Sequence, residues 1–257
     1  MSTNHSVLLV GGTGRTGGRV LTQLLERGIA VRAIVRSAMR LPEGVMDNPL
    51  LCVVEASLLS LTSAELQRHL GGRDTVISCL GHTISVKGIF GPPFNIVTRA
   101  VSDLAGAVQA MQPTKPVRFI LMNTVAVEQP GKAEKARGAG QRFCLWVMRV
   151  LLPPARDNQR AAEFFVLRIG VSHAHIEWVA VRPDTLREGD ITDYRLHDEL
   201  ASSIFRPNET NMVNVAHFMC ELTCNGDTWK RWRGRMPVIV NAGGDTIASL
   251  TPGKWPA

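Results

Sequence analysis

Three glycines near the N-terminus have a spacing that suits the binding of a diphosphate. Gly11, Gly14 and Gly17 follow a short apolar run and open a helical pattern in the segment VLLVGGTGRTGGRV. After a strand, one glycine permits a tight turn, a second lets a pyrophosphate approach the backbone, and a third lets the helix pack on the strand. Free N–H groups at the helix start favour an anion. The pattern predicts a dinucleotide site; the alternative is a glycine-rich turn without a ligand.

Polar and basic side chains accompany these glycines. Thr13 and Thr16 supply hydroxyl groups, and Arg15 supplies a charge. About 20 residues further on, where NAD-binding proteins carry an acid for the ribose 2′-hydroxyl, the chain has Arg36, with Arg40 one helical turn later. Two guanidinium groups can clamp a 2′-phosphate, so the sequence favours NADP(H) over NAD(H). The alternative is that both arginines face water.

The elements that must position these residues alternate along the chain. Short β-branched runs predict strands near residues 7–10, 31–35, 51–54, 75–79, 118–122, 177–181 and 237–240. Longer periodic stretches predict helices over residues 15–26, 61–70, 95–111, 143–152, 158–169 and 213–223. This alternation predicts a Rossmann-type, doubly wound α/β fold, with a mostly parallel sheet of about seven strands and helices on both faces.

Composition sets the limits of this interpretation. With 257 residues, 45% hydrophobic and 20% charged, the chain fits a single domain over 1–257. We expect a cytoplasmic protein, because the N-terminus lacks a signal-peptide pattern and the apolar run from Phe143 is too short to span a membrane. The net charge of +7 comes without a nucleic-acid-binding motif, so we predict no nucleic-acid partner.

The cysteines indicate neither disulfides nor a metal. Five cysteines are spread along the chain, which favours reduced thiols. Cys220 and Cys224 share a helical face, but no second cysteine pair completes a metal site. We interpret both as core residues and predict no metal.

Taken in order, several motifs resemble a known superfamily. The segments VGGTGRTGGRV, VRSAMRL, DTVISCLGHT, RFILMNTVAV, DNQRAAEFF and WVAVRPDTL span about residues 6 to 220. Together they resemble the short-chain dehydrogenase/reductase superfamily, in particular its atypical members related to biliverdin reductase B, a flavin reductase, and the NmrA-like proteins. The first motif is specific to dinucleotide binding, whereas the others are specific only as an ordered set.

The resemblance implies where the adenosine half of the cofactor would lie. SCLGHT matches the end of the fourth strand, so Cys79, Leu80 and Gly81 would pass close to the adenosine ribose and diphosphate. VEASL matches a Gly-Asp-Leu segment near the adenine but departs from it, which leaves Ser57 and Leu58 as weaker assignments.

The resemblance also implies the nicotinamide end. LMNTVAV matches the end of the fifth strand and would place Thr124 beside the nicotinamide, where Thr124 would orient the ring or the acceptor. VRPDTL matches the end of the sixth strand, with the Pro183 backbone at the carboxamide and Asp184 as the best-placed polar neighbour. Thr124 and Asp184 are therefore the candidate catalytic residues. All these positions follow strands, where an open α/β sheet binds its ligands.

One expected motif is missing. Typical members use Tyr-x-x-x-Lys as the general acid of carbonyl reduction, but the only tyrosine, Tyr194, has no lysine four residues on. The corresponding helix, DNQRAAEFFVLRIG, holds neither residue and is expected to begin with Asp157 as its N-cap. His82 is another candidate proton donor, although we favour a surface position for this lone loop histidine.

Two regions are expected to form the acceptor side. The segment 128–156 is longer than a simple connection and could be a lid, a protein-partner surface through residues 128–154, or plain packing against the sheet. The C-terminal part, about 183–257, is expected to contribute residues 187–196 to the acceptor side, while MPVIVNA closes the sheet.

These observations favour an NADP(H)-dependent oxidoreductase of the atypical short-chain type. Hydride transfer to a small conjugated acceptor such as a flavin or quinone needs no strong protein acid, because the acceptor ring spreads the incoming charge. The alternative is a non-catalytic NADP-binding regulatory or redox-sensor protein, as among the NmrA-like members, which the loss of Tyr-x-x-x-Lys favours.

Overall fold

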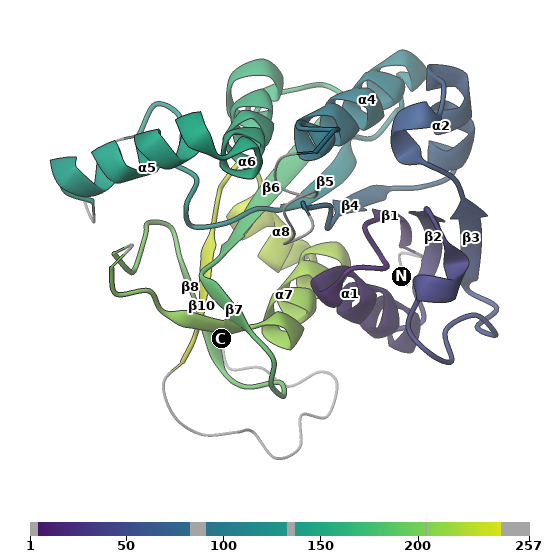
Figure 1. Ribbon diagram of the computed structural model, residues 1–257. Helices are drawn as coiled ribbons and strands as arrows, with labels where there is room; N and C mark the ends of the chain where they lie inside the picture. Colours follow the sequence, from purple (N-terminus) through teal and green to yellow (C-terminus); the bar gives the residue numbers. More distant parts are fainter. Residues whose placement is uncertain (1–4, 83–90, 133–136, 204, 243–257) are drawn as a thin grey trace.

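An eight-stranded sheet forms the centre of the molecule (Figure 1). The computed structural model describes residues 5–82, 91–132, 137–203 and 205–242. The strand order is β3-β2-β1-β4-β5-β6-β10-β8. These strands are β1 (Ser6–Val10), β2 (Ala30–Val35), β3 (Leu51–Glu55), β4 (Thr75–Ser78), β5 (Val117–Met122), β6 (Ile176–Pro183), β8 (Tyr194–His197) and β10 (Val238–Asn241). Neighbouring strands are parallel except β10 and β8, and a separate parallel pair joins β7 (Thr185–Arg187) to β9 (Glu209–Asn211).

The central strands are buried on both faces because their apolar residues are continuous. In β1, Leu8 and Val10 join the core on one face of the sheet, while Val7 and Leu9 join the core on the other. Successive side chains of a strand point to opposite faces, so an uninterrupted apolar run supplies two cores at once. This pattern is typical of a parallel sheet covered by helices.

Helices cover each face of the sheet (Figure 1). Helices α2, α4 and α6 pack on one core, and α1, α7 and α8 pack on the other. The helices are α1 (Arg15–Glu26), α2 (Ser63–Leu70), α4 (Ile96–Met111), α5 (Ala139–Leu151), α6 (Pro153–Glu163), α7 (Met212–Cys224) and α8 (Gly226–Trp232), with short 3-10 helices η1 (Ala38–Arg40) and η2 (Leu58–Ser60) and a π-helix η3 (Phe164–Ile169). The predicted Rossmann-type fold is confirmed.

The strand count differs from the prediction of about seven. The additional strand, β8, pairs antiparallel with β10, so MPVIVNA lies inside the sheet and does not close it. The sequence YRLH of β8 has no β-branched residue, which leaves a weak strand signal. Tyr194 and Leu196 nevertheless contact the core, and this packing holds the strand.

The helices after β5 also differ from the prediction. Helix α5 begins four residues earlier than expected, and α6 begins at Pro153, five residues before the expected start at residue 158. Proline suits the first turn of a helix, where its missing N–H needs no partner. Asp157 therefore lies inside α6, and the predicted N-cap role is wrong because Leu152 occupies that position.

Parts of the predicted acceptor side lie outside the described residues. These are residues 133–136 of the 128–156 segment and residues 204 and 243–257 of the C-terminal part. Among the helices of the described ranges, none has the length and apolarity that a membrane crossing needs.

Candidate functional site

The glycine-rich turn between β1 and α1 is shaped by backbone contacts. Gly11 has φ +82°, and a Cβ on it would lie 2.6 Å from the carbonyl carbon of Cys79. A Cβ on Gly17 would lie 2.1 Å from the carbonyl oxygen of Gly11. Both distances are far below a van der Waals contact, so these two positions require glycine.

The start of α1 fits an anion. Gly14 is the N-cap residue, is exposed, and supplies no side-chain cap to the first turn. The N–H groups of a first helical turn have no partner within the helix, and the helix dipole places partial positive charge beside them. Arg15 is exposed at the first helical position, whereas Thr16 is buried. A diphosphate matches this arrangement in charge and in the space left by Gly14.

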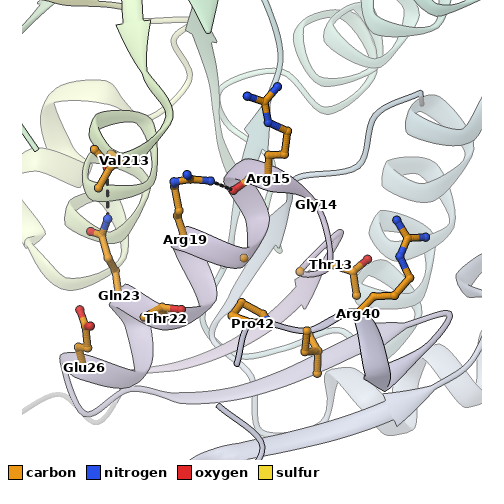
Figure 2. A pocket seen from close by; sticks show the side chains of 13 residues that line it. Thr13, Gly14, Arg15, Arg19, Thr22, Gln23, Glu26, Arg40, Pro42 and Val213 are labelled. Carbon is orange, nitrogen blue, oxygen red and sulfur yellow. Dashed lines mark hydrogen bonds between the residues drawn. The ribbon is translucent and has the colours of Figure 1, made fainter. Parts of the chain in front are cut away.

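A cavity of about 520 Å³ lies against this turn (Figure 2). Figure 2 places Thr13 and Arg40 on one side of it and Arg19 and Gln23 on the other. Its floor includes Pro42, which approaches α1 so closely that a Cβ on Gly18 would lie 3.1 Å from the proline ring. The lining residues are Gly12, Thr13, Gly14, Arg15, Gly18, Arg19, Thr22, Gln23, Glu26, Arg40, Leu41, Pro42 and Val213.

The two arginines of the predicted 2′-phosphate site are placed differently. Arg40 lines the cavity, whereas Arg36 is exposed at the end of β2 and does not line it. The sequence showed no acid close to them, but the register of β2 and β3 brings Glu55 opposite Val35. The Glu55 carboxylate accepts a hydrogen bond of 2.9 Å from the Ala38 N–H. Parallel pairing of β2 and β3 was the signal that could have located this acid.

Arg15 and Arg19 share a carboxylate from a distant segment. The Arg15 guanidinium donates to Glu188 Oε1 at 2.8 Å, and Arg19 donates to the other Glu188 oxygen. The hydrogen bond from Arg15, with the charges of both arginines, lowers the pKa of Glu188. Glu188 follows β7, so this contact joins the glycine-rich turn to the predicted acceptor side. Nothing in the local sequence around Glu188 indicated it.

The remaining adenosine-side residues lie at strand ends. Cys79 is buried directly after β4, where its carbonyl group meets Gly11, and burial raises the pKa of its thiol to about 12. Leu80 packs against the core and Gly81 is exposed. Ser57 is the N-cap residue of η2, and Leu58 is buried. These positions follow β3 and β4, on the same edge of the sheet as the glycine-rich turn.

Thr124 and Pro183 are brought together after β5 and β6. The Val125 N–H donates to the Pro183 carbonyl oxygen at 3.2 Å, so the residue after Thr124 is bonded to the end of β6. The Thr124 hydroxyl accepts a hydrogen bond of 3.3 Å from the Ala126 N–H. Asn123 is buried, and its side-chain oxygen accepts from the Thr124 N–H. Thr124 is thus held in a bonded turn at the carboxyl edge.

Asp184 is buried and organises its own surroundings. Its Oδ1 accepts from the Thr185 N–H at 2.9 Å, and its Oδ2 accepts from the Asn208 N–H at 3.0 Å and from the Ser202 hydroxyl. Both carboxylate oxygens are therefore engaged by the chain itself. Ser202 and Asn208 were not singled out from the sequence, because neither belongs to a motif.

The favoured surface position for His82 is wrong. The side chain is only 6% exposed, and its Nε2 lies 2.9 Å from Oδ2 of Asp157. Asp157 is itself buried and accepts hydrogen bonds from the N–H groups of Val97 and Thr98, at 2.8 and 2.9 Å. This carboxylate, from within α6, caps the first turn of α4. Helix α6, which lacks the Tyr-x-x-x-Lys pair, thus stabilises a neighbouring helix.

Tyr194 is not part of a Tyr-x-x-x-Lys pair, and its partner is a histidine. Its hydroxyl oxygen is 2.9 Å from Nδ1 of His217 on α7, and burial raises the pKa of Tyr194 above its usual value. Burial, aided by the charge of Arg27, lowers the pKa of His217 to about 4. Both residues line a separate cavity of about 460 Å³ between β8, α7 and α8.

Cys220 and Cys224 both pack in the core, as expected, whereas Cys52 is exposed. Cys220 is buried in the core, and burial raises the pKa of Cys224 to about 11. All five cysteines are free. Within the part of the chain that the structure describes, no cluster of three or more His, Cys, Asp or Glu residues could hold a metal.

A family model and solved structures match this chain. The model of an NAD(P)H-binding family matches residues 11–225. The oxidoreductase ylbE from Lactococcus lactis is 20% identical with a TM-score of 0.66, covering 92% of this chain and 91% of that one. A short-chain dehydrogenase/reductase from Veillonella parvula in complex with NADP is 13% identical with a TM-score of 0.63, covering 93% and 95%. A Streptococcus pneumoniae protein described as an NADH-flavin reductase is 15% identical with a TM-score of 0.61, covering 93% and 100%. At these identities the likeness shows the fold alone.

Two curated relatives from Arabidopsis thaliana match part of the chain. The chloroplast protein At2g34460 is 29% identical over 124 residues, 47% of this chain and 41% of the relative. The chloroplast protein TIC 62 is 29% identical over 140 residues, 49% of this chain and 21% of the relative. The chain thus matches less than half the length of either relative. Its cytoplasmic location stays a prediction.

Proposed function

The chain belongs to the NAD(P)H-binding family, as its resemblance to the short-chain dehydrogenase/reductase superfamily led us to expect, and from this premise we propose an NADP(H)-dependent oxidoreductase. Its acceptor is a small conjugated molecule such as a flavin or quinone. The observation that carries the proposal is the glycine-rich turn, where Gly11 and Gly17 leave no room for a Cβ and the exposed Gly14 caps the start of α1, with Thr13 and Arg40 on the adjoining cavity.

The preference for NADP(H) rests on charge. A 2′-phosphate carries nearly two negative charges and is held best by guanidinium groups that need no other partner. Arg40 faces the cavity, and Arg36 is exposed one residue after β2. The nearest acid, Glu55, has an oxygen engaged by the Ala38 N–H. The proposed adenosine site comprises Gly11, Thr13, Gly14, Arg15, Thr16, Gly17, Arg36, Arg40, Ser57, Leu58, Cys79, Leu80 and Gly81.

The proposed nicotinamide site lies where β5 and β6 end. A bound NADPH would supply the hydride, and an acceptor that spreads the incoming charge over its ring requires positioning more than acid catalysis. Thr124, fixed in the turn that bonds to Pro183, is proposed to orient the nicotinamide or the acceptor. Because both oxygens of Asp184 are engaged, we give Asp184 a positioning role for the loop that holds Asn208.

A second candidate is an NADP-binding regulatory protein without turnover. The observation that favours it is the structural role of α6. In typical members of the superfamily this helix carries the tyrosine and lysine of the general acid, whereas here its Asp157 caps α4. The helix thus contributes to structure, and nucleotide binding alone would then be the function.

The cofactor assignment is tested by titration of the purified protein. Transfer of excitation from tryptophan to NADPH and NADH gives both affinities, for wild type and for the double variant Arg36→Ala/Arg40→Ala. We expect NADPH binding to weaken by about 30-fold or more, as for loss of two charge-assisted contacts, with little change for NADH. The matched control is Arg168→Ala/Arg195→Ala, two exposed arginines away from the cavity. Equal weakening for both nucleotides would contradict the 2′-phosphate assignment.

Turnover separates the two candidate functions. NADPH absorbance is followed while FMN and then a soluble quinone are added to the same sample. Oxidation that slows in Thr124→Val at unchanged NADPH affinity, and recovers in Thr124→Ser, supports the reductase and the role of Thr124. Tight NADPH binding with no oxidation by either acceptor would favour the regulatory protein.

A further inference from the structure

Helix α5 carries an exposed apolar surface. The described residues include thirteen large hydrophobic side chains that are exposed, and five of them lie between residues 143 and 151 of this one helix. Phe143, Trp146, Val150 and Leu151 are each more than half exposed, whereas Leu145 is the buried residue of the helix. Such a concentration exceeds the single exposed apolar residues that are normal on a protein surface.

The spacing gathers these side chains on one side of the helix. Phe143, Trp146 and Val150 stand at i, i+3 and i+7, which aligns them along one helical face. The Phe143 and Trp146 rings stack with their centroids 5.9 Å apart. Figure 1 shows α5 reaching outward from α6, beyond the layers that cover the sheet. We call the surface of Phe143, Trp146, Val150 and Leu151 the α5 stripe.

Positive charge runs along one edge of the α5 stripe. Arg142 and Arg149 are seven residues apart and flank it on the side of Leu145. Both approach one carboxylate, that of Glu128, at 4.0 and 3.0 Å. The Arg142 side chain is 61% exposed and that of Arg149 only 20%, so Arg142 is the more exposed of the two cations beside the stripe.

We propose that the α5 stripe docks onto an anionic lipid surface. An amphipathic helix with Trp, Phe and aliphatic residues on one face and arginines beside them lies in the plane of a membrane interface. The aromatic rings then occupy the headgroup region, while the exposed Arg142 guanidinium extends to a lipid phosphate. The net charge of +7 adds a long-range attraction to an anionic surface. This binding is independent of nucleotide turnover.

Charge also favours an anionic membrane over a second copy of this chain or a nucleic acid as the partner of the α5 stripe. In an antiparallel twofold pairing of two α5 helices, Arg142 and Arg149 of both chains would lie on the same side of the contact, and the single Glu128 of each chain offsets only one of its two arginine charges. A nucleic acid would satisfy the arginines but leave Phe143, Trp146 and Val150 without apolar contact. An anionic membrane satisfies both the apolar and the basic residues.

The test is flotation of the full chain with phosphatidylglycerol-containing vesicles and with pure phosphatidylcholine vesicles. We expect binding to the anionic vesicles only, weakened in about 1 M salt, where screening acts within about 3 Å. The variant Phe143→Ser/Trp146→Ser/Val150→Ser should lose this binding by at least about tenfold. The control Leu167→Ser/Val171→Ser/Phe205→Ser removes three equally exposed apolar residues elsewhere and should keep it.

Several outcomes would overturn the proposal. These are absence of binding to anionic vesicles, equal binding by the α5 variant, or a wild-type dimer that the α5 variant converts to monomer without any vesicle binding. NADPH affinity of each variant, measured in parallel, reports whether the fold is retained. Because the vesicle result does not involve an acceptor, it stands or fails separately from the proposed reductase.

Discussion

The glycine-rich turn and the segments after β6 are held by different kinds of contact. In the turn, backbone atoms of β1, α1 and Cys79 meet so closely that Gly11 and Gly17 cannot carry a Cβ. After β6, side chains make the connections: Asp184 binds Asn208, and Asn214 binds Thr192 and Asn241. The glycines of the first arrangement lie within seven consecutive residues, with Cys79 as their distant contact, whereas the second joins residues 22 to 27 positions apart.

This difference predicts different responses to substitution. A backbone contact leaves no room for adjustment, because moving it shifts a strand or a helix. A side-chain network can lose one member and retain the others, so a substitution there has a smaller effect unless it leaves a buried polar group unpaired.

The largest effect is expected at Gly17. In Gly17→Ala the new methyl group would lie 2.1 Å from the Gly11 oxygen, so α1 must move away from β1. We expect the free energy of unfolding to fall by about 3 kcal/mol, measured by urea denaturation. The control, Gly106→Ala, lies in α4 with nothing within 4 Å of its Cβ and should gain about 0.5–1 kcal/mol. Equal midpoints for Gly17→Ala and wild type would contradict the rigid turn.

Asp157 should give the next largest effect, although it belongs to a side-chain network. Asp157→Ala leaves the N–H groups of Val97 and Thr98 and the His82 ring without their buried acceptor. We expect unfolding free energy to fall by about 2 kcal/mol, also from urea denaturation. Asp103→Ala removes a half-exposed carboxylate from the same helix α4 and serves as control, with a change below about 0.5 kcal/mol. Similar losses in both variants would show that burial of Asp157 contributes little.

Gly17 and Asp157 also show which parts of this structure can be predicted from the sequence. Gly17 could be assigned because a strand, a fixed glycine spacing and a helix follow each other without interruption. The same local patterns located seven strands of the sheet and helices on both faces, but they missed α8. Asp157 was assigned to its own helix, since an N-cap preference acts locally and the chain does not reveal that α4 would lie beside α6. Glu188 and Glu55 were missed for the same reason: only the folded sheet brings them to Arg15 and Ala38.

Acid should destabilise the region after β6 through His217, whose imidazole contacts Tyr194 of β8. Burial lowers its pKa to about 4, so the folded protein keeps this imidazole neutral where the unfolded chain protonates it. The unfolded state therefore binds more protons between pH 6.5 and 4, and stability is lost as pH falls through this range. We expect a contribution of about 2 kcal/mol between pH 7 and 5.

The measurement is urea denaturation at both pH values. His217→Gln should be less stable at pH 7, since the Tyr194 contact changes, but its stability should fall less on acidification than that of wild type. His173→Gln, at a histidine without this burial, should retain the wild-type pH dependence. An unchanged pH dependence in His217→Gln would remove His217 as its source.

The smallest effect is expected where the two regions meet, at Glu188. Its carboxylate holds Arg15 and Arg19, which lie in α1 next to the glycine-rich turn. Exposed ion pairs contribute little to stability, so Glu188→Gln should leave the unfolding free energy within about 0.5 kcal/mol of wild type. Nucleotide affinity should change more than the unfolding free energy does, because the substitution leaves two guanidinium groups able to bind phosphate. We expect NADPH binding to tighten by about threefold at low salt and the gain to vanish at high salt.

Glu209→Gln provides the matched control for this prediction. Glu209 pairs with Arg187 at 2.9 Å and is as exposed as Glu188, yet its partner belongs to the β7–β9 pair and not to α1. Its removal should leave NADPH affinity unchanged at every salt concentration. Weaker NADPH binding in Glu188→Gln would mean that Glu188 orients Arg15 toward the diphosphate and does not compete with it. In that case the segment after β7 would be part of the nucleotide site, and the division between the two regions would lie further along the chain.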